Sequence, residues 1–301
     1  MGWTEVTRWL GPRVAAEPII APSPGWYLGA GEKAGLPARL RRQVWRSLRE
    51  PFEVEWLEGV KLTLFPGNET SRAVFITGRY EPNEFHLLAK ILRPGMTFID
   101  VGANMGLYSL FSAKKVGEHG KVLAFEPSRR EYEVVKKNVE ANRLSNVTLL
   151  HLALSDKPAE VELLIAPSRH SGHNTLGGFA YDTPLERREP VAAERLDDVV
   201  RKESLTRADV IKMDIEGAEL RALRGAVETL ARFHPILFVE VSDRSLRQQG
   251  CTREDLLDFI LRRGYLLYQF DRQTGFPVAL KLQSLSESEN VVAVPAGTQA
   301  W

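Results

Sequence analysis

The stretch TFIDVGANMG at residues 97–106 decides the fold of this chain. The apolar run that ends at Asp100 predicts a buried strand, and residues 107–115 predict a helix. Between them, the pattern Asp-x-Gly-x-x-x-Gly, with Gly102 and Gly106, predicts a tight turn at a helix N-terminus. Such a turn lets backbone N–H groups approach a ligand closely, although a turn that binds nothing has the same pattern.

The glycine spacing indicates which ligand the turn suits. A dinucleotide-binding fingerprint would need glycine where this chain has Asn104, which argues against a nicotinamide oxidoreductase. The carboxylate of Asp100 would repel a pyrophosphate but attract the ammonium group of an amino acid. We therefore predict S-adenosylmethionine as the ligand, bound by Asp100, Gly102, Asn104 and Gly106.

The next two predicted strands supply the second half of the cofactor site. The strand at residues 121–125 is followed by Glu126, which lies 26 residues after Asp100 and should emerge beside it at the same sheet edge. A carboxylate there can accept two hydrogen bonds from a ribose diol. A third strand at residues 147–154 ends where an adenine could be bracketed. The predicted binding residues are Glu126, Pro127 and Leu154.

Composition and charge narrow the class of protein. The chain has 301 residues, 44% of them apolar and 26% charged, which is ordinary for a globular protein. A net charge of +1 provides no field for non-specific nucleic-acid binding, so no nucleic-acid partner is expected. The single cysteine, Cys251, excludes an internal disulfide and fits a reducing cytoplasm, where we expect the protein to reside. No apolar run reaches the roughly 18 residues of a transmembrane helix.

The chain divides into an N-terminal extension at residues 1–93 and a cofactor-binding domain at residues 94–301. The extension begins irregularly and contains a basic helix at residues 37–49, which could contact an anionic membrane surface. The alternative, a solvated face with one stripe packed on the domain, is the more common use of such a helix. Residues 54–78 predict a β-hairpin with its turn at residues 66–68 and its second strand at residues 73–76, and a helix then runs to Leu92.

From Thr97 onward, strands and helices alternate, which predicts an α/β fold with a doubly wound, mostly parallel sheet and helices on both faces. The later strands are expected at residues 210–214, 235–241, 265–270 and 290–294, with helices at residues 216–231 and 252–262. A polar loop at residues 166–190 interrupts this alternation. It carries Arg169, His170, His173 and Asn174, and we expect it to form a mobile lid over the acceptor side.

Acidic residues at the ends of the later strands are the candidates for chemistry. Asp214 closes the strand expected next to the first one, so it should contact the cofactor or the acceptor. Glu240 closes the following strand and could act as a base, hold a divalent metal or anchor the acceptor. His173 is a third candidate base, although histidines in a polar loop are usually only solvated. For Glu216 and Glu219, helix capping is as good an explanation as a functional role.

Several of these motifs together resemble the FkbM family of S-adenosylmethionine-dependent methyltransferases. They are FIDVGANMG at residues 98–106, AFEP at 124–127, RLDD at 195–198 and IKMDIEGAE at 211–219. The flanking segments at residues 80–82 and 238–240 are similar too, and the first of them adds Glu81 to the predicted cofactor site. The resemblance covers roughly residues 55–270.

The resemblance implies a class I methyltransferase fold and O-methylation of a sugar, glycolipid or polyketide-type natural product, with S-adenosylhomocysteine as the second product. The sequence also lacks the Asn-Pro-Pro-aromatic motif with which other methyltransferases hold a nucleobase, so a hydroxyl acceptor is favoured. The alternatives are a methyltransferase that acts on RNA or protein and a non-catalytic relative that only binds the cofactor. The sequence does not identify the acceptor, a metal requirement or the oligomeric state.

Overall fold

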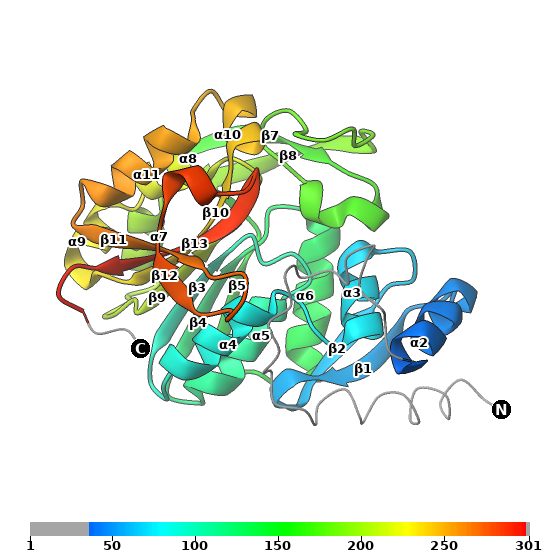
Figure 1. Cartoon of the computed structure of the whole chain (residues 1–301). Coiled ribbons are helices and arrows are strands. Elements are labelled where there is room, and N and C mark those ends of the chain that lie inside the picture. Colours follow the sequence, from blue (N-terminus) through cyan, green and yellow to red (C-terminus); the bar gives the residue numbers. More distant parts are fainter. Residues whose placement is uncertain (1–35, 299–301) are drawn as a thin grey trace.

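An eight-stranded sheet forms the centre of the protein (Figure 1). The structure is a computed structural model that describes residues 36–298. The strands of the sheet in chain order are β3 (Thr97–Val101), β4 (Lys121–Phe125), β5 (Val147–Leu150), β9 (Val210–Met213), β10 (Ile236–Ser242), β11 (Tyr265–Phe270), β12 (Pro277–Ala279) and β13 (Ser288–Pro295). In space, they are arranged in the order β12-β11-β13-β10-β9-β3-β4-β5.

The part of the sheet that carries the site is parallel. Strands β10, β9, β3, β4 and β5 pair in parallel, and β13 lies antiparallel between β10 and β11. The carboxyl ends of the five parallel strands therefore meet at one edge, with β9 directly beside β3. This arrangement confirms the predicted doubly wound, mostly parallel α/β fold.

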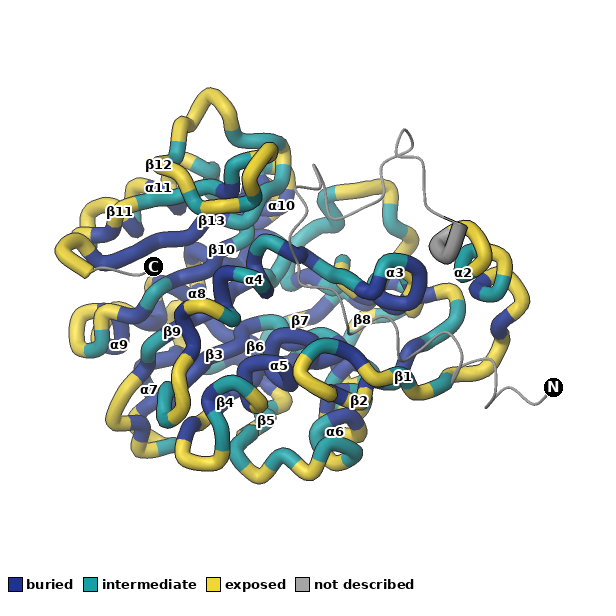
Figure 2. Tube along the Cα trace, turned by 60° about the horizontal axis from the view of Figure 1, so that its bottom comes forward, coloured by how far each residue is buried: buried dark blue, intermediate teal, exposed yellow. Residues whose placement is uncertain are grey.

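Alternate side chains of each strand enter two separate cores, because successive residues of a strand point to opposite faces. Phe98 packs into one core with α4 (Pro82–Ile91), α5 (Leu107–Val116) and α6 (Arg129–Ala141). Its neighbour Ile99 packs into the other core, which includes residues of α7 (Leu196–Lys202), α8 (Glu219–Arg224), α9 (Val227–Phe233), α10 (Asp243–Gln248) and α11 (Arg253–Leu261). Burial on both faces explains why these strands read as unbroken apolar runs; Figure 2 shows the buried strands under more exposed loops.

The N-terminal extension packs onto the first of these cores. Its described elements are α2 (Leu36–Ser47), β1 (Phe52–Trp56), the 3-10 turn η1 (Leu57–Gly59), β2 (Val60–Leu64), α3 (Glu69–Thr77) and α4. Trp45, Trp56 and Phe75 belong to the same cluster as Phe98. In Figure 1, the extension lies on the opposite side of the molecule from β11 and β12.

The predicted hairpin at residues 54–78 is wrong in its second half. The hairpin is formed by β1 and β2, which pair antiparallel from Phe52↔Leu64 to Trp56↔Val60. Residues 73–76 instead lie in helix α3. Asn68 caps this helix by accepting a hydrogen bond from the Ser71 N–H, and Gly78 ends it in a left-handed conformation. These capping residues favour a helix over the strand that the apolar run suggested.

Other differences occur where a tertiary contact interrupts a local pattern. The predicted strand at residues 147–154 divides into β5 and β6 (Ala153–Leu154), which joins a second sheet with β7 (Ala159–Ile165) and β8 (Arg187–Glu194). Because residues 187–190 pair with β7, the polar loop ends at residue 186 rather than 190. The predicted helix at residues 216–231 is broken between α8 and α9, since the carboxylate of Asp197 accepts hydrogen bonds from the N–H groups of Glu228 and Thr229.

Helix α2 has the packed stripe of the more common alternative. Trp45 of α2 and Leu48 just after the helix are buried, whereas Arg39 and Arg46 of the helix and Arg49 beyond it are exposed. Membrane contact by this helix stays a prediction. Within residues 36–298, every helix is too short or too polar to cross a bilayer. The remaining 3-10 segments are η2 (Ser168–His173) and η3 (Leu282–Ser284).

Candidate active site

Two adjoining cavities lie at the carboxyl edge of the parallel strands. The larger cavity has a volume of about 580 Å³, and the predicted site residues that line it are Glu81, Gly102, Asn104, His173, Asp214 and Glu240. The smaller cavity, of about 60 Å³, is lined by Glu126, Pro127 and Leu154. Gly102, Asn104 and Asp214 line both cavities, so the turn after β3 and the end of β9 separate the two.

Gly102 allows the ends of β3 and β9 to meet. Its φ of +86° is unfavourable for other residues, and a Cβ atom at this position would lie 2.1 Å from the carbonyl oxygen of Asp214. Any side chain here would push Asp214 away from the turn. The glycine in the sequence motif therefore positions an acidic residue that follows more than 100 residues later.

The sequence predicted that the backbone N–H groups of the turn face a ligand, but three of them bond to the protein instead. Those of Gly102 and Ala103 both donate to the carbonyl oxygen of Phe125, at 3.0 and 2.9 Å. The N–H of Asn104 donates to Oε2 of Glu126 at 2.7 Å. These hydrogen bonds hold the turn against the end of β4. The three N–H groups are therefore not available to a ligand, and other atoms of the turn line the cavities.

Glu126 is a buried hydrogen-bond acceptor at the wall of the smaller cavity. Its second oxygen, Oε1, accepts from the N–H of Ser128 at 2.9 Å, and only 5% of the residue is exposed. Burial, followed by the charge of Glu131, raises the pKa of Glu126 to about 8. Pro127 and Leu154 lie on the same cavity wall. A polar acceptor beside apolar surface suits a nucleoside.

Two predicted binding residues lie behind the turn. Asp100 is fully buried and lines neither cavity; Ser109 donates to its Oδ2, while Oδ1 has no hydrogen-bond partner among the described residues. Burial raises the pKa of Asp100. Gly106 also lines neither cavity and begins helix α5 with a φ of +89°. Both residues therefore shape the turn from within, and direct contact with a ligand stays a prediction.

A buried lysine balances the acidic end of β9. Lys212 is 6% exposed, and its Nζ lies 3.3 Å from Oδ2 of Asp214, 3.4 Å from the carbonyl oxygen of Gly102 and 4.8 Å from the centre of the Tyr108 ring. Although burial alone would lower it, the pKa of Lys212 is raised by the carboxylates of Asp214, Asp100 and Glu81. Lys212 thus stays charged and holds Asp214 against the turn.

Glu81 belongs to a buried acidic group that lines the larger cavity. Tyr108 donates to its Oε2, and Asn290 Nδ2 donates to Oε1 of Glu81 at 3.3 Å and to Oε1 of Glu84 at 3.0 Å. Burial, and next the charge of Glu84, raises the pKa of Glu81 to about 8. A bound cation would stabilise the ionised form of these carboxyls.

The remaining acidic residues have distinct roles. Glu240 accepts a hydrogen bond from Ser288 at 2.7 Å, and its buried Oε2 has no hydrogen-bond partner among the described residues. Burial, followed by the charge of Asp214, raises its pKa well above the ordinary value. Glu219 caps the start of its helix, since Oε1 accepts from the N–H groups of Ile215 and Gly217. Glu216 instead lines both cavities, and burial raises its pKa to about 8.

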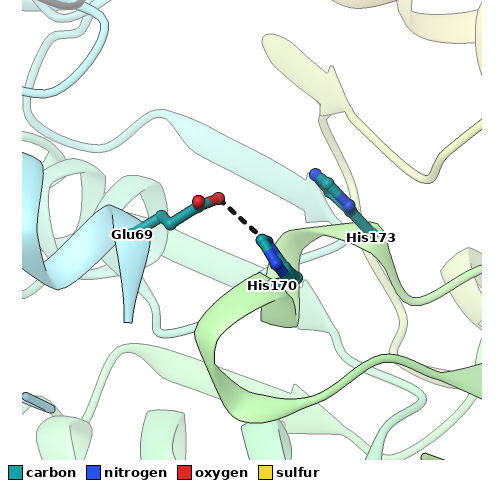
Figure 3. Close-up of side chains that lie close together, drawn as sticks. All are labelled: Glu69, His170 and His173. Carbon is teal, nitrogen blue, oxygen red and sulfur yellow. Dashed lines mark hydrogen bonds and ion pairs between the residues drawn. The ribbon is translucent and has the colours of Figure 1, made fainter. Parts of the chain in front are cut away.

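The polar loop lies beside Asp214, and its place over an acceptor stays a prediction. Arg169, His170 and His173 line the larger cavity together with Asp214, whereas Asn174 lines the smaller one. Partial burial, and then the neighbouring His170, lowers the pKa of His173. Figure 3 shows both histidine rings beside Glu69 of α3. The mobility of this loop stays a prediction.

Sequence reasoning assigned no role to several lining residues. Lys212 had a detectable signal, because a lysine inside an otherwise apolar strand requires a buried partner. Tyr108, Glu84, Tyr181 and Asn290 had none, since their contacts join segments that are far apart in the chain.

Comparisons with known proteins identify the family of this chain. The family described as "Methyltransferase FkbM domain" matches residues 100–267, which are 168 of the 301 residues. Methyltransferase sdnD of Sordaria araneosa is 32% identical over 156 residues, which cover 43% of this chain and 60% of that protein. The 2-O-methyltransferase NoeI of Sinorhizobium fredii is 24% identical over 65% of this chain and 83% of its own length.

The chain is also similar to a solved structure. The methyltransferase FkbM of Methylobacillus flagellatus KT has a TM-score of 0.41 and 18% identity, and the match covers 73% of this chain and 52% of that one. The chain spans less than two thirds of the Sordaria protein. Because the family match covers more than half of the chain and contains the turn, Glu126, Asp214 and Glu240, this protein belongs to the FkbM methyltransferase family.

Proposed function

We propose that the protein is an S-adenosylmethionine-dependent O-methyltransferase whose acceptor is a hydroxyl of a sugar, glycolipid or polyketide-type natural product. The observation that carries this proposal is a cavity lined by the carboxyl groups of Glu81 and Asp214 that adjoins the Glu126 pocket. Carboxylates favour a ligand with a sulfonium and an ammonium group, and they disfavour the pyrophosphate of a dinucleotide. The 2-O-methyltransferase name of a relative supports oxygen as the acceptor atom.

The residues of the two cavities divide the cofactor between them. Glu126 binds the ribose hydroxyls, and Pro127 and Leu154 flank the adenine in the smaller cavity. Glu81 and Asp214 face the amino-acid end in the larger cavity. When bound, S-adenosylmethionine supplies a methyl group that is already activated on a sulfonium, so the protein has to position the acceptor and remove its proton.

Glu240 is the group that we assign to the acceptor proton. Its Oε2 is buried without a hydrogen-bond partner among the described residues, so it can accept a hydrogen bond from an acceptor hydroxyl. Its raised pKa makes its carboxylate a stronger base than an ordinary glutamate. Lys212 keeps Asp214 in place beside it.

Calorimetry and a transfer assay test the proposal. S-adenosylmethionine should bind and NAD should not, and Glu126→Gln should weaken binding by about 1–3 kcal/mol, the scale for hydrogen bonds to a charged group. A screen of glycans, polyketide alcohols and RNA with labelled cofactor then identifies the acceptor. Methyl transfer to RNA alone would refute the proposed acceptor class. An unchanged affinity of the Glu126→Gln variant for S-adenosylmethionine would refute the assignment of Glu126 to the ribose.

Glu240→Gln separates cofactor binding from chemistry. It keeps the shape of the side chain and removes the base, so turnover should fall by about 100-fold or more while calorimetric cofactor affinity changes little. Full turnover by this variant would assign Glu240 a structural role.

A further inference from the structure

Three side chains from two distant segments meet at the rim of the larger cavity (Figure 3). Glu69 is the first residue of α3 in the N-terminal extension, whereas His170 and His173 lie in η2. One potential ligand atom from each residue lies within 4.8 Å of the other two. Oε2 of Glu69 is 3.2 Å from Nδ1 of His170, and the two imidazole rings stack with centroids 5.4 Å apart.

An ion pair between Glu69 and His170 accounts for only part of this arrangement. It does not involve the ring of His173, which lies nearly parallel to that of His170, with an interplanar angle of 15°. A shared cation would draw two imidazoles and one carboxylate together. This set of ligands occurs in catalytic zinc sites and in other sites that keep a coordination position open.

Neighbouring groups orient one of the three side chains and join the two segments that carry them. Nδ1 of His173 lies 2.8 Å from Oγ1 of Thr183, which orients the ring and leaves Nε2 for coordination. The amide of Asn68 donates to the carbonyl oxygen of Ser168 at 2.8 Å and to Oγ of Ser171 at 3.0 Å. These bonds attach η2 to the start of α3, so the segments that carry the ligands are already joined.

We propose that Glu69, His170 and His173 bind one divalent transition-metal ion of the zinc type. Ligands about 2.0–2.1 Å from a tetrahedral zinc ion stand about 3.3 Å apart, so these atoms, which lie within 4.8 Å of one another, need to approach by at most about 1.5 Å. Imidazole nitrogens favour zinc, cobalt and nickel ions over magnesium and calcium. Glu69 and His170 keep side-chain exposures of 40% and 20%, which gives a metal ion access from solvent.

The position of the site suggests what its open coordination position does. All three residues line the cavity that contains Asp214 and Glu240. A metal ion there faces the space that we assign to the acceptor, where it can bind an acceptor oxygen. Only this last step rests on the proposed methyl transfer; the metal site stands on its own geometry and is tested without any acceptor.

The test uses the full chain, freed of metal with a chelator. Zinc ions are titrated in competition with a chromophoric chelator, and cobalt ions are added separately so that their visible spectrum reports the geometry. We expect one ion per chain with a cobalt spectrum typical of mixed nitrogen and oxygen ligands. His170→Ala, His173→Ala and Glu69→Gln should each weaken binding at least about tenfold, and Thr183→Val should weaken it by about tenfold through the orientation of His173.

His119→Ala is the matched control. His119 is exposed and precedes β4, at the edge of the sheet opposite the site, so its removal should leave the affinity unchanged. Each variant is checked for unaltered urea unfolding without metal, which separates loss of the site from loss of the fold. Failure to bind zinc stoichiometrically, or an equal affinity in all variants, would overturn the proposal and leave the Glu69–His170 pair as an ion pair. Magnesium ions should not compete.

Discussion

Gly102→Ala tests whether the close contact between the turn and Asp214 builds the site. The added Cβ would lie 2.1 Å from the carbonyl oxygen of Asp214 and 2.9 Å from Cγ2 of Ile215. Two costs follow. A left-handed backbone at a residue with a Cβ costs roughly 1–2 kcal/mol, and forcing atoms into a filled site typically costs about 1–3 kcal/mol more. We therefore expect a loss of unfolding free energy of about 2–5 kcal/mol.

Gly95→Ala is the matched control for this change. Gly95 has a φ of +84°, close to the +86° of Gly102, but a Cβ there would meet no atom within 4 Å. Both variants carry the same backbone cost and the same change in the entropy of the unfolded chain. The difference between them therefore isolates the steric contact, at about 1–3 kcal/mol.

Urea unfolding followed by far-ultraviolet circular dichroism measures both variants at one pH, with the free energy extrapolated linearly to water. If the two variants lose the same free energy within about 0.5 kcal/mol, the reasoning is refuted, because the strand ends would then move apart at no cost. Calorimetry adds a functional measurement: Gly102→Ala, but not Gly95→Ala, should weaken cofactor binding, since only it displaces Asp214.

Two further predictions concern charge and the polar loop. The pKa of Glu81 is raised from 4.5 to about 8, so between these pH values the folded state binds more protons than the unfolded chain. The contribution of Glu81 to stability is therefore lost as the pH rises from about 4.5 to about 8. Glu81→Gln should make the urea stability of the cofactor-free protein less steep over this range, by at most about 1.4 kcal/mol per pH unit; a slope identical to that of the parent would contradict the raised pKa. Asn68→Ala should cost about 1 kcal/mol through the lost cap of α3 and speed hydrogen exchange in residues 168–173, which it anchors. Thr252→Ala removes a comparable cap from α11 and should leave that exchange unchanged. Equal exchange rates of residues 168–173 in the two variants would show that Asn68 does not anchor the loop.

The sequence alone determined the parts of the protein that depend on local order. The strand, turn and helix around Gly102 could be predicted because apolar periodicity and glycine spacing are properties of neighbouring residues. The placement of Glu126 and Asp214 at one edge of the sheet could be predicted as well. Parallel strands joined by helices have right-handed crossovers, and their carboxyl ends lie at the same edge. The family resemblance rested on these same motifs and was confirmed.

Only the tertiary structure decided which polar side chains reach the cavities. Asp100 turns into the interior while Glu126 lines a cavity wall, although each lies at the end of a strand. Glu216 lines the cavities and Glu219 caps a helix three residues later. Glu69 meets His170 across 101 residues of chain. Each outcome depends on packing between distant segments, because burial decides whether a polar group needs a partner in the protein or can bind a ligand, and burial is set by all the segments around it.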